Sequence, residues 1–254
     1  MLKNTIFFYP FLLFILISSA LYISLSDYSI IQQDSLSEQA TIIQNMSDRE
    51  FDAFVVDYVS NAQNSAESSS TIQSNLEELG IEFIPEANGI SPYFSSSDVS
   101  LSSYAAKRYG DTFYRVYGQV TFLAKENQPA KEDILAIGWD TNQASYYSYN
   151  EGDYANAREY NTSKGIFSFN IDDTKMIANN VAYGVVYVIP KTSATKLDTA
   201  TTFLHTYNEP SHVWSGGLTL YYNKKPSGII QISVTSSSVG ASTLFYANNS
   251  ICLN

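Results

Sequence analysis

Cysteine, histidine, tryptophan and charged side chains are all scarce in this chain. Cys252 is the single cysteine among 254 residues, so no intrachain disulfide can form. Charged residues make up 15% of the sequence, which is fewer than in an average soluble protein. A chain of this length without disulfides depends on a hydrophobic core, and a hydrophobic content of 44% is enough to build one.

Sequence motifs that fix a particular reaction are also missing. The chain contains no GxSxG, P-loop, GxGxxG or CxxC motif. Cys252 lies next to the C-terminus, where a shell that positions a nucleophile is rare, so we expect an ordinary free thiol. We therefore expect no cofactor, and we expect a non-enzymatic function rather than catalysis.

Acidic residues outnumber basic residues, and this balance excludes one class of partner. The formal net charge is -11 at pH 7, and such a surface repels the phosphates of nucleic acids. We predict that the chain binds no nucleic acid. The charge also keeps a protein soluble, which is its simplest explanation.

The N-terminus carries a long apolar segment. Residues 6–25 read IFFYPFLLFILISSALYISL, and Lys3 is the only charge before Asp27. A run of about 20 apolar residues is long enough to cross a bilayer as a helix, and the preceding lysine orients the N-terminus inward. We predict that residues 1–26 are a cleaved signal peptide or an uncleaved membrane anchor, with membrane contact through residues 6–25 in the second case.

Residues 27–85 are expected to be a helical stalk or packing region. Ser47 and Glu50 have the spacing of a capping box, which predicts that a helix begins just after Ser47. Apolar residues then recur at helical spacing from Phe51 onward. A further short helix is expected to end at Gly80.

Residues 86–254 are expected to form a β-rich extracytoplasmic domain, because the hydrophobic period changes from 3.6 to 2. In residues 113–124 apolar residues alternate with Arg115 and Gln119, which predicts a half-buried strand. Residues 181–189 are apolar on both faces and predict a central strand, while 218–222 and 229–235 predict a hairpin. The predicted fold class is α+β, with helices followed by a mainly antiparallel, sandwich-like β domain.

Tyrosine is unusually frequent, and one stretch of the β region suggests a binding surface. Aromatic rings with neighbouring amide and carboxylate groups suit sugars, because sugar C–H faces stack on rings and hydroxyls bond to amides. The candidate binding residues are Trp139, Tyr146, Tyr147, Tyr149 and Tyr154. A tyrosine-rich strand edge without a ligand explains the same pattern, so a glycan or protein partner is a hypothesis.

The two histidines suggest a metal site, although the sequence pattern is not specific to one. His205, Glu209 and His212 offer imidazole and carboxylate ligands that suit zinc. Their spacing differs from HExxH, and Pro210 prevents one helix from aligning all three. The alternative is a solvated loop that needs no metal, in which replacing both histidines changes the unfolding free energy by only about 0.5 kcal/mol.

These observations favour an exported cell-envelope or secreted protein, whose β domain acts in binding, adhesion or assembly. The order of an apolar helix, an amphipathic helical region and a β-rich head resembles type IV pilins, which implies a minor-pilin-like structural subunit as an alternative. The likeness concerns architecture only, since the chain lacks the Gly and Glu of the pilin signature around its apolar segment. A secreted metal-dependent hydrolase using His205, Glu209 and His212 is the opposing alternative.

Overall fold

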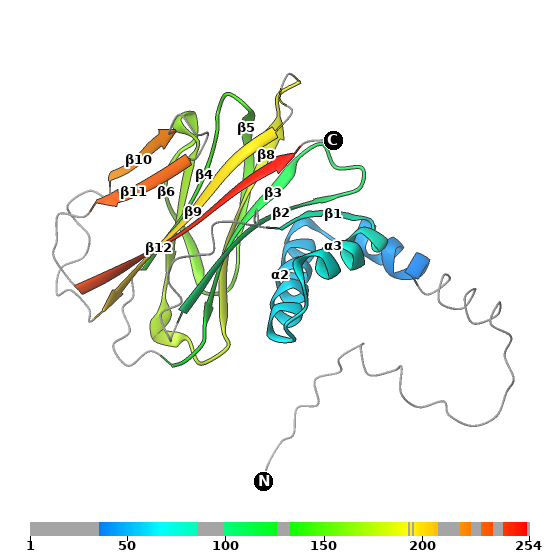
Figure 1. The fold of residues 1–254 in the computed structure, drawn as a ribbon, viewed down its shortest axis with the longest axis horizontal. Helices are drawn as coiled ribbons and strands as arrows, with labels where there is room; N and C mark the ends of the chain where they lie inside the picture. The colour runs from blue at the N-terminus through cyan, green and yellow to red at the C-terminus, as the bar shows by residue number, and fades with distance from the viewer. Residues whose placement is uncertain are drawn as a thin grey trace, which may run out of the picture.

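The computed structural model describes residues 36–85, 99–125, 133–192, 194, 196–207, 219–224, 230–235 and 241–252. Helices come first and antiparallel strands follow, as the change of hydrophobic period predicts (Figure 1). The apolar segment 6–25 lies outside the described residues. Within them, no helix combines the length and the apolar character needed to cross a membrane.

The helical region consists of a segment over residues 36–45, α2 (Asp48–Asn64) and α3 (Ser69–Glu78). The predicted capping box is confirmed: the Glu50 N–H donates to Ser47 Oγ at 3.3 Å, and the Ser47 N–H donates to Glu50 Oε2 at 2.9 Å. Gly80 follows α3 with a φ of +79°, a conformation that favours glycine and ends the helix there.

The first sheet has five antiparallel strands in the order β1-β2-β3-β8-β5. Its members are β1 (Ile81–Ile84), β2 (Val99–Arg108), β3 (Tyr114–Phe122), β8 (Val181–Pro190) and β5 (Ala144–Glu151). β8 lies inside this sheet, between β3 and β5, in agreement with its apolar sequence. The edge strand β5 carries an irregular register between Tyr146 and Ser148.

The second sheet also has five antiparallel strands, in the order β12-β9-β4-β7-β6. Its members are β12 (Ala241–Cys252), β9 (Lys196–Tyr207), β4 (Asp133–Trp139), β7 (Ile166–Ile171) and β6 (Ala155–Asn161). The predicted hairpin is confirmed as the antiparallel pair β10 (Thr219–Lys224) and β11 (Ile230–Thr235). Two short 3-10 helices, η2 (Thr162–Lys164) and η3 (Asp173–Lys175), flank β7.

The two sheets share one apolar core, which we call the inter-sheet core. It contains Val116, Val120 and Phe122 from the first sheet and Phe169 and Phe203 from the second, among other buried side chains. Gly118 and Gly184 pair with each other across β3 and β8. A Cβ atom at Gly184 would lie 2.3 Å from the Phe169 ring, so the absence of a side chain there lets the second sheet approach.

The helices cover the outer face of the first sheet (Figure 1). Phe51 and Val55 of α2 pack with Tyr117, Tyr183 and Val185 in a second core, which we call the helix-side core. The prediction that the strand over residues 113–124 is half-buried is therefore wrong, because every residue of β3 is buried. Its polar side chains face the helices instead of water.

Candidate functional site

An aromatic cluster lies where β5 and β6, the edge strands of the two sheets, come together. Tyr149 of β5 and Tyr160 of β6 pack on Phe167 of β7, with ring centroids 4.6 and 5.3 Å apart respectively. Tyr149 remains 40% exposed and Tyr160 64% exposed. Tyr146 also stacks on Phe167, at 6.1 Å. Two aromatic rings are therefore held in place by the core while they present surface to solvent.

An open pocket of about 410 Å³ adjoins Tyr149. It lies between the first turn of α2 and the turn from β5 to β6, and most of its lining is polar. The lining residues are Arg49, Tyr149, Asn150, Glu151, Gly152, Asp153, Ala155 and Asn156. A pocket of this size falls in the range that holds small ligands, and its amides and carboxylates suit a ligand rich in hydroxyl groups.

Asn150 connects this pocket to a buried polar network under α2. Its side-chain amide donates to Asp52 Oδ2 at 2.7 Å, and Tyr117 Oη donates to Asp52 Oδ1 at 2.7 Å. Tyr187 Oη also donates to Asp52 Oδ2, and Arg115 Nε lies 3.3 Å from Asp52 Oδ1. These contacts fix the pocket wall, because the Asn150 side chain cannot turn without leaving the buried carboxylate.

Arg115 occupies the centre of the same network and is fully buried. Its Nη1 lies 2.6 Å from Asp111 and its Nη2 lies 2.6 Å from Asp48. The guanidinium carbon is 4.5 Å from the ring centroids of both Phe51 and Phe113, a geometry for cation–π attraction. A buried charge is tolerated here because carboxylates and aromatic faces surround it.

Burial dominates the electrostatics of the network. Desolvation raises the pKa of the Asp52 carboxyl, although hydrogen bonds from Tyr187, Asn150 and Tyr117 and the charge of Arg115 act in the opposite direction. Desolvation, reinforced by the negative charges of Asp52 and Asp57, also raises the pKa of Tyr183 to about 12. The folded state therefore holds the Asp52 proton more tightly than the unfolded chain does.

The structure divides the five aromatic residues that the sequence suggested as binding residues. Trp139 is fully buried and stacks on Tyr146 in the inter-sheet core, with ring centroids 6.1 Å apart. Tyr146 and Tyr154 are partly buried and pack against that core. Tyr147 is 54% exposed but contacts Phe113, at 5.1 Å, and not Phe167. Tyr149 alone combines an exposed ring with a place in the pocket wall.

Asp52 is a site residue that sequence reasoning missed. Its signal is present in the sequence, because Asp52 lies on the apolar stripe of α2 that also carries Val55, Val56 and Val59. An acidic residue on the buried face of a helix requires a partner inside the protein. The partners themselves come from β3, β5 and β8 and have no sequence signal.

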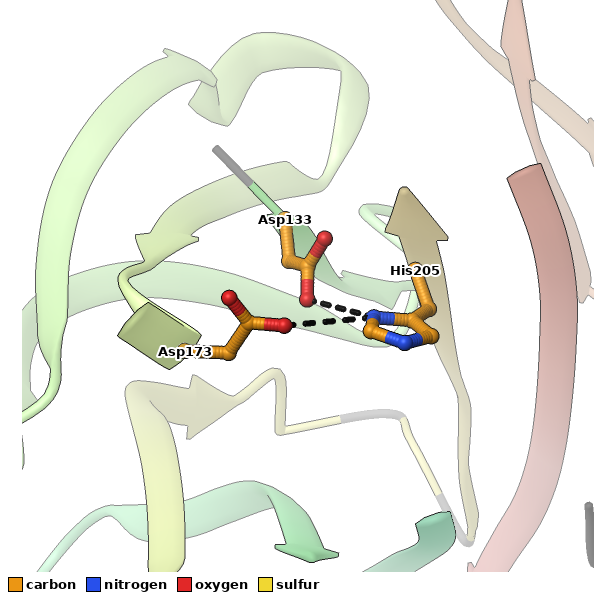
Figure 2. A group of neighbouring side chains, drawn as sticks. All are labelled: Asp133, Asp173 and His205. Carbon is orange, nitrogen blue, oxygen red and sulfur yellow. Dashed lines mark hydrogen bonds and ion pairs between the residues drawn. The ribbon is translucent and has the colours of Figure 1, made fainter. Parts of the chain in front are cut away.

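A second group of buried polar side chains lies at one end of the inter-sheet core (Figure 2). His205 Nδ1 is 2.7 Å from Asp133 Oδ2 and 3.7 Å from Asp173 Oδ2. Asp133 is 0% exposed, and Asp173 and His205 are each 1% exposed. The Phe203 ring stacks on the imidazole at 5.9 Å, and the Phe122 ring meets it edge-on at 6.2 Å. The imidazole is thus fixed with Nδ1 toward both carboxylates.

His205 does not lie in a loop, as the sequence suggested, but on strand β9. The loop interpretation relied on Pro210, which lies beyond the end of β9 at Tyr207. Glu209 and His212, the other two members of the predicted ligand set, lie outside the described residues. The structure instead brings His205 together with two aspartates that are 72 and 32 positions away in the sequence.

The chain matches no protein-family model and no curated protein. Among solved structures, it is similar to one described as pH-induced modulation of Streptococcus parasanguinis adhesion by Fap1 fimbriae, with 14% identity and a TM-score of 0.36, over 68% of this chain and 96% of that chain. It is also similar to the sixth cohesin of Acetivibrio cellulolyticus scaffoldin B, solved with a Cel5 dockerin mutant, with 12% identity and a TM-score of 0.30, over 38% and 77%.

A third similar structure is an uncharacterized protein from Nocardia farcinica with an immunoglobulin-like fold. It shares 12% identity at a TM-score of 0.25, over 55% of this chain and 98% of that chain. At such identities a likeness concerns the fold alone, and TM-scores below 0.5 give it no functional weight.

Proposed function

We propose that this chain is a sandwich-like, non-enzymatic binding module that recognises a glycan at the junction of β5 and β6. The observation that carries the proposal is Tyr149, an exposed ring at the rim of a polar pocket. Sugar rings stack on such a face through their C–H groups, while their hydroxyls bond to amides and carboxylates. Asn150, Glu151 and Asn156, which also line the pocket, carry those groups.

The rigidity of this surface supports recognition. Asn150 is held by Asp52, and Glu151 Oε2 accepts a hydrogen bond from the Ala157 N–H at 2.5 Å across the turn between β5 and β6. Tyr149 is held by Phe167. A surface ordered before binding loses little conformational entropy when a ligand arrives.

The proposal includes a place outside the cytoplasm. Residues 1–26 act as a signal peptide or an anchor, residues 27–85 support the strands, and residues 86–254 carry the binding surface. The motivation is the apolar segment 6–25 with Lys3 before it. A reporter fused after residue 60 should be active outside the cytoplasm, and retention of the full-length fusion inside would contradict this placement.

The binding test is a glycan array followed by calorimetry on the glycans that bind. Tyr149→Ala should weaken binding about tenfold or more, equivalent to about 1.4 kcal/mol, and Tyr149→Phe should keep most of it because the ring remains. Tyr109→Ala is the matched control, since Tyr109 is 52% exposed and does not line the pocket. An array without binders, or binding that Tyr149→Ala leaves unchanged, would remove the proposal.

A further inference from the structure

We propose that Asp133, Asp173 and His205 form a structural site for one divalent transition-metal ion, with Zn²⁺ as the ion that fits the ligands best. This site is separate from the glycan surface and does not depend on it. It also differs from the ligand set suggested by the sequence, with which it shares His205 only.

Three elements converge to build the site. Asp133 is the first residue of β4, and His205 lies on the antiparallel neighbour β9. Ile134, which follows Asp133, pairs with Leu204, which precedes His205. Asp173 begins η3, directly after the end of β7. β4 lies between β7 and β9 in the sheet, so the three side chains meet at the same end of three adjacent strands (Figure 2).

The separations suit a single ion. Ligand atoms that each lie about 2.1 Å from a tetrahedral zinc ion lie about 3.4 Å from one another. The distances from His205 Nδ1 to the two carboxylate oxygens, 2.7 and 3.7 Å, bracket that value. The potential ligand atoms of all three residues lie within 4.8 Å of one another.

Burial gives the ion a clear energetic role. Two buried carboxylates that lie close together repel each other and are costly to keep charged. A divalent cation between them removes this repulsion and binds a neutral imidazole at the same time. Since the three residues are 0–1% exposed, the ion would connect β4, β7–η3 and β9 and would not act on a substrate.

The ligand types select the ion. Imidazole suits zinc and other transition metals, whereas calcium and magnesium prefer sites made of oxygen atoms. Two carboxylates and one imidazole match the nitrogen and oxygen ligands of zinc sites, and water can complete the coordination.

The test uses the full chain, purified and dialysed against a chelator, with Zn²⁺ alone as the probe. Calorimetry should show one bound ion per chain. Zn²⁺ at about a hundredfold excess over its Kd should raise the melting temperature by about 5–10 °C. Absence of both uptake and a melting shift would overturn the proposal without any variant. Preferential binding of Ca²⁺ or Mg²⁺ at equal concentration would overturn the assignment of the ion.

Variants then locate the site. Asp173→Asn should weaken Zn²⁺ binding at least tenfold, because a neutral amide replaces a charged ligand of similar size. Asp172→Asn is the matched control, since Asp172 is the preceding residue, pairs with Lys175 at 3.0 Å and should leave Zn²⁺ affinity unchanged. If His212→Ala or Glu209→Gln abolishes binding while Asp173→Asn does not, the ligand set suggested by the sequence is correct and this proposal is wrong.

Discussion

The two faces of the first sheet are both buried, but they bury different kinds of side chain. Toward the second sheet, β3 presents Val116, Val120 and Phe122 to an apolar core. Toward the helices, the same strand presents Arg115 and Gln119, both fully buried. Gln119 accepts a hydrogen bond from Tyr104 at 2.7 Å and donates one to Ser60 at 3.1 Å. One strand therefore carries a face stabilised by packing and a face stabilised by paired polar groups.

The difference shows what a polar side chain on alternate strand positions means. Alternation identifies the strand, but it does not show that the polar face is in water. A polar face can equally be covered by an element that supplies partners, and here α2 supplies Asp48 and Asp52 to Arg115. The stability of this face then depends on matched polar pairs as well as on the apolar helix-side core, whereas that of the other depends on filled volume.

Removing Asp52 should have the largest effect. Asp52→Ala leaves three buried donors without their shared acceptor and removes one of the three carboxylates around Arg115, so the unfolding free energy should fall by about 3–5 kcal/mol. Arg115→Ala together with Asp52→Ala should cost less than the sum of the two single changes, with a coupling of about 0.5–3 kcal/mol. Urea denaturation of the two single variants and the double variant measures this coupling.

Val116→Ala is the control on the opposite face of β3. It should cost about 2 kcal/mol through lost burial and cavity formation, and its effect should add to that of Asp52→Ala. Full additivity of Asp52→Ala and Arg115→Ala would show that the two faces do not differ in kind.

Replacing His205 should have the next largest effect on the unfolding free energy, because His205 is a buried polar side chain at the end of the apolar inter-sheet core. His205→Ala removes a buried partner of Asp133 and should lower the unfolding free energy by about 2–4 kcal/mol in metal-free buffer. This replaces the small effect that the loop interpretation implied. Thermal or urea denaturation checks it. A change below about 0.5 kcal/mol would mean that His205 contributes little to stability.

The pH dependence of stability should separate the two faces further. Since burial raises the pKa of Asp52, the folded state is favoured below the ordinary carboxyl pKa, and this advantage is lost as the pH rises through the raised pKa. The unfolding free energy of the wild type minus that of Asp52→Asn should therefore decrease as the pH increases above about 4, by about 1.4 kcal/mol for each unit by which the pKa is raised.

Urea denaturation across this range provides the measurement, with Val116→Ala as a variant whose difference from the wild type should stay constant. A difference for Asp52→Asn that increases with pH would mean that the charge of Arg115 outweighs desolvation.

Ser47→Ala should have the smallest effect. It removes the cap of α2, which positions Asp52, but it breaks no buried pair, so the expected loss is about 1 kcal/mol. Circular dichroism during thermal unfolding would detect it as a decrease of a few degrees in melting temperature. A loss as large as that of Asp52→Ala would mean that the cap controls the whole helix-side core.

Local sequence signals predicted the elements well. The Ser47–Glu50 capping box, the end of a helix at Gly80 and the β10–β11 hairpin each depend on residues close in the chain, and all three are confirmed. The burial of both faces of β3 could not be predicted, because it depends on where α2 packs. Polar alternation alone gave the wrong answer for this reason.

The candidate sites were harder to predict, because their residues are distant in sequence. Tyr149 was suggested by local composition, but the same composition also suggested Trp139, whose ring fills the inter-sheet core. Asp133 and Asp173 carry no local pattern that connects them with His205. Only the pairing of β4 with β7 and β9 brings these three residues together.

Gly118 and Gly184, which pair across β3 and β8, limit how this sequence can vary. Side chains at Gly118 and Gly184 would collide with Thr201 and with the Phe169 ring respectively. The second sheet therefore packs directly against the backbone of these two glycines. A larger side chain in one sheet can then be accommodated only if the side chain opposite it becomes smaller, so a larger residue at 184 requires a smaller one at 169. In distant relatives the two positions should covary as one unit, even where no other residue is shared.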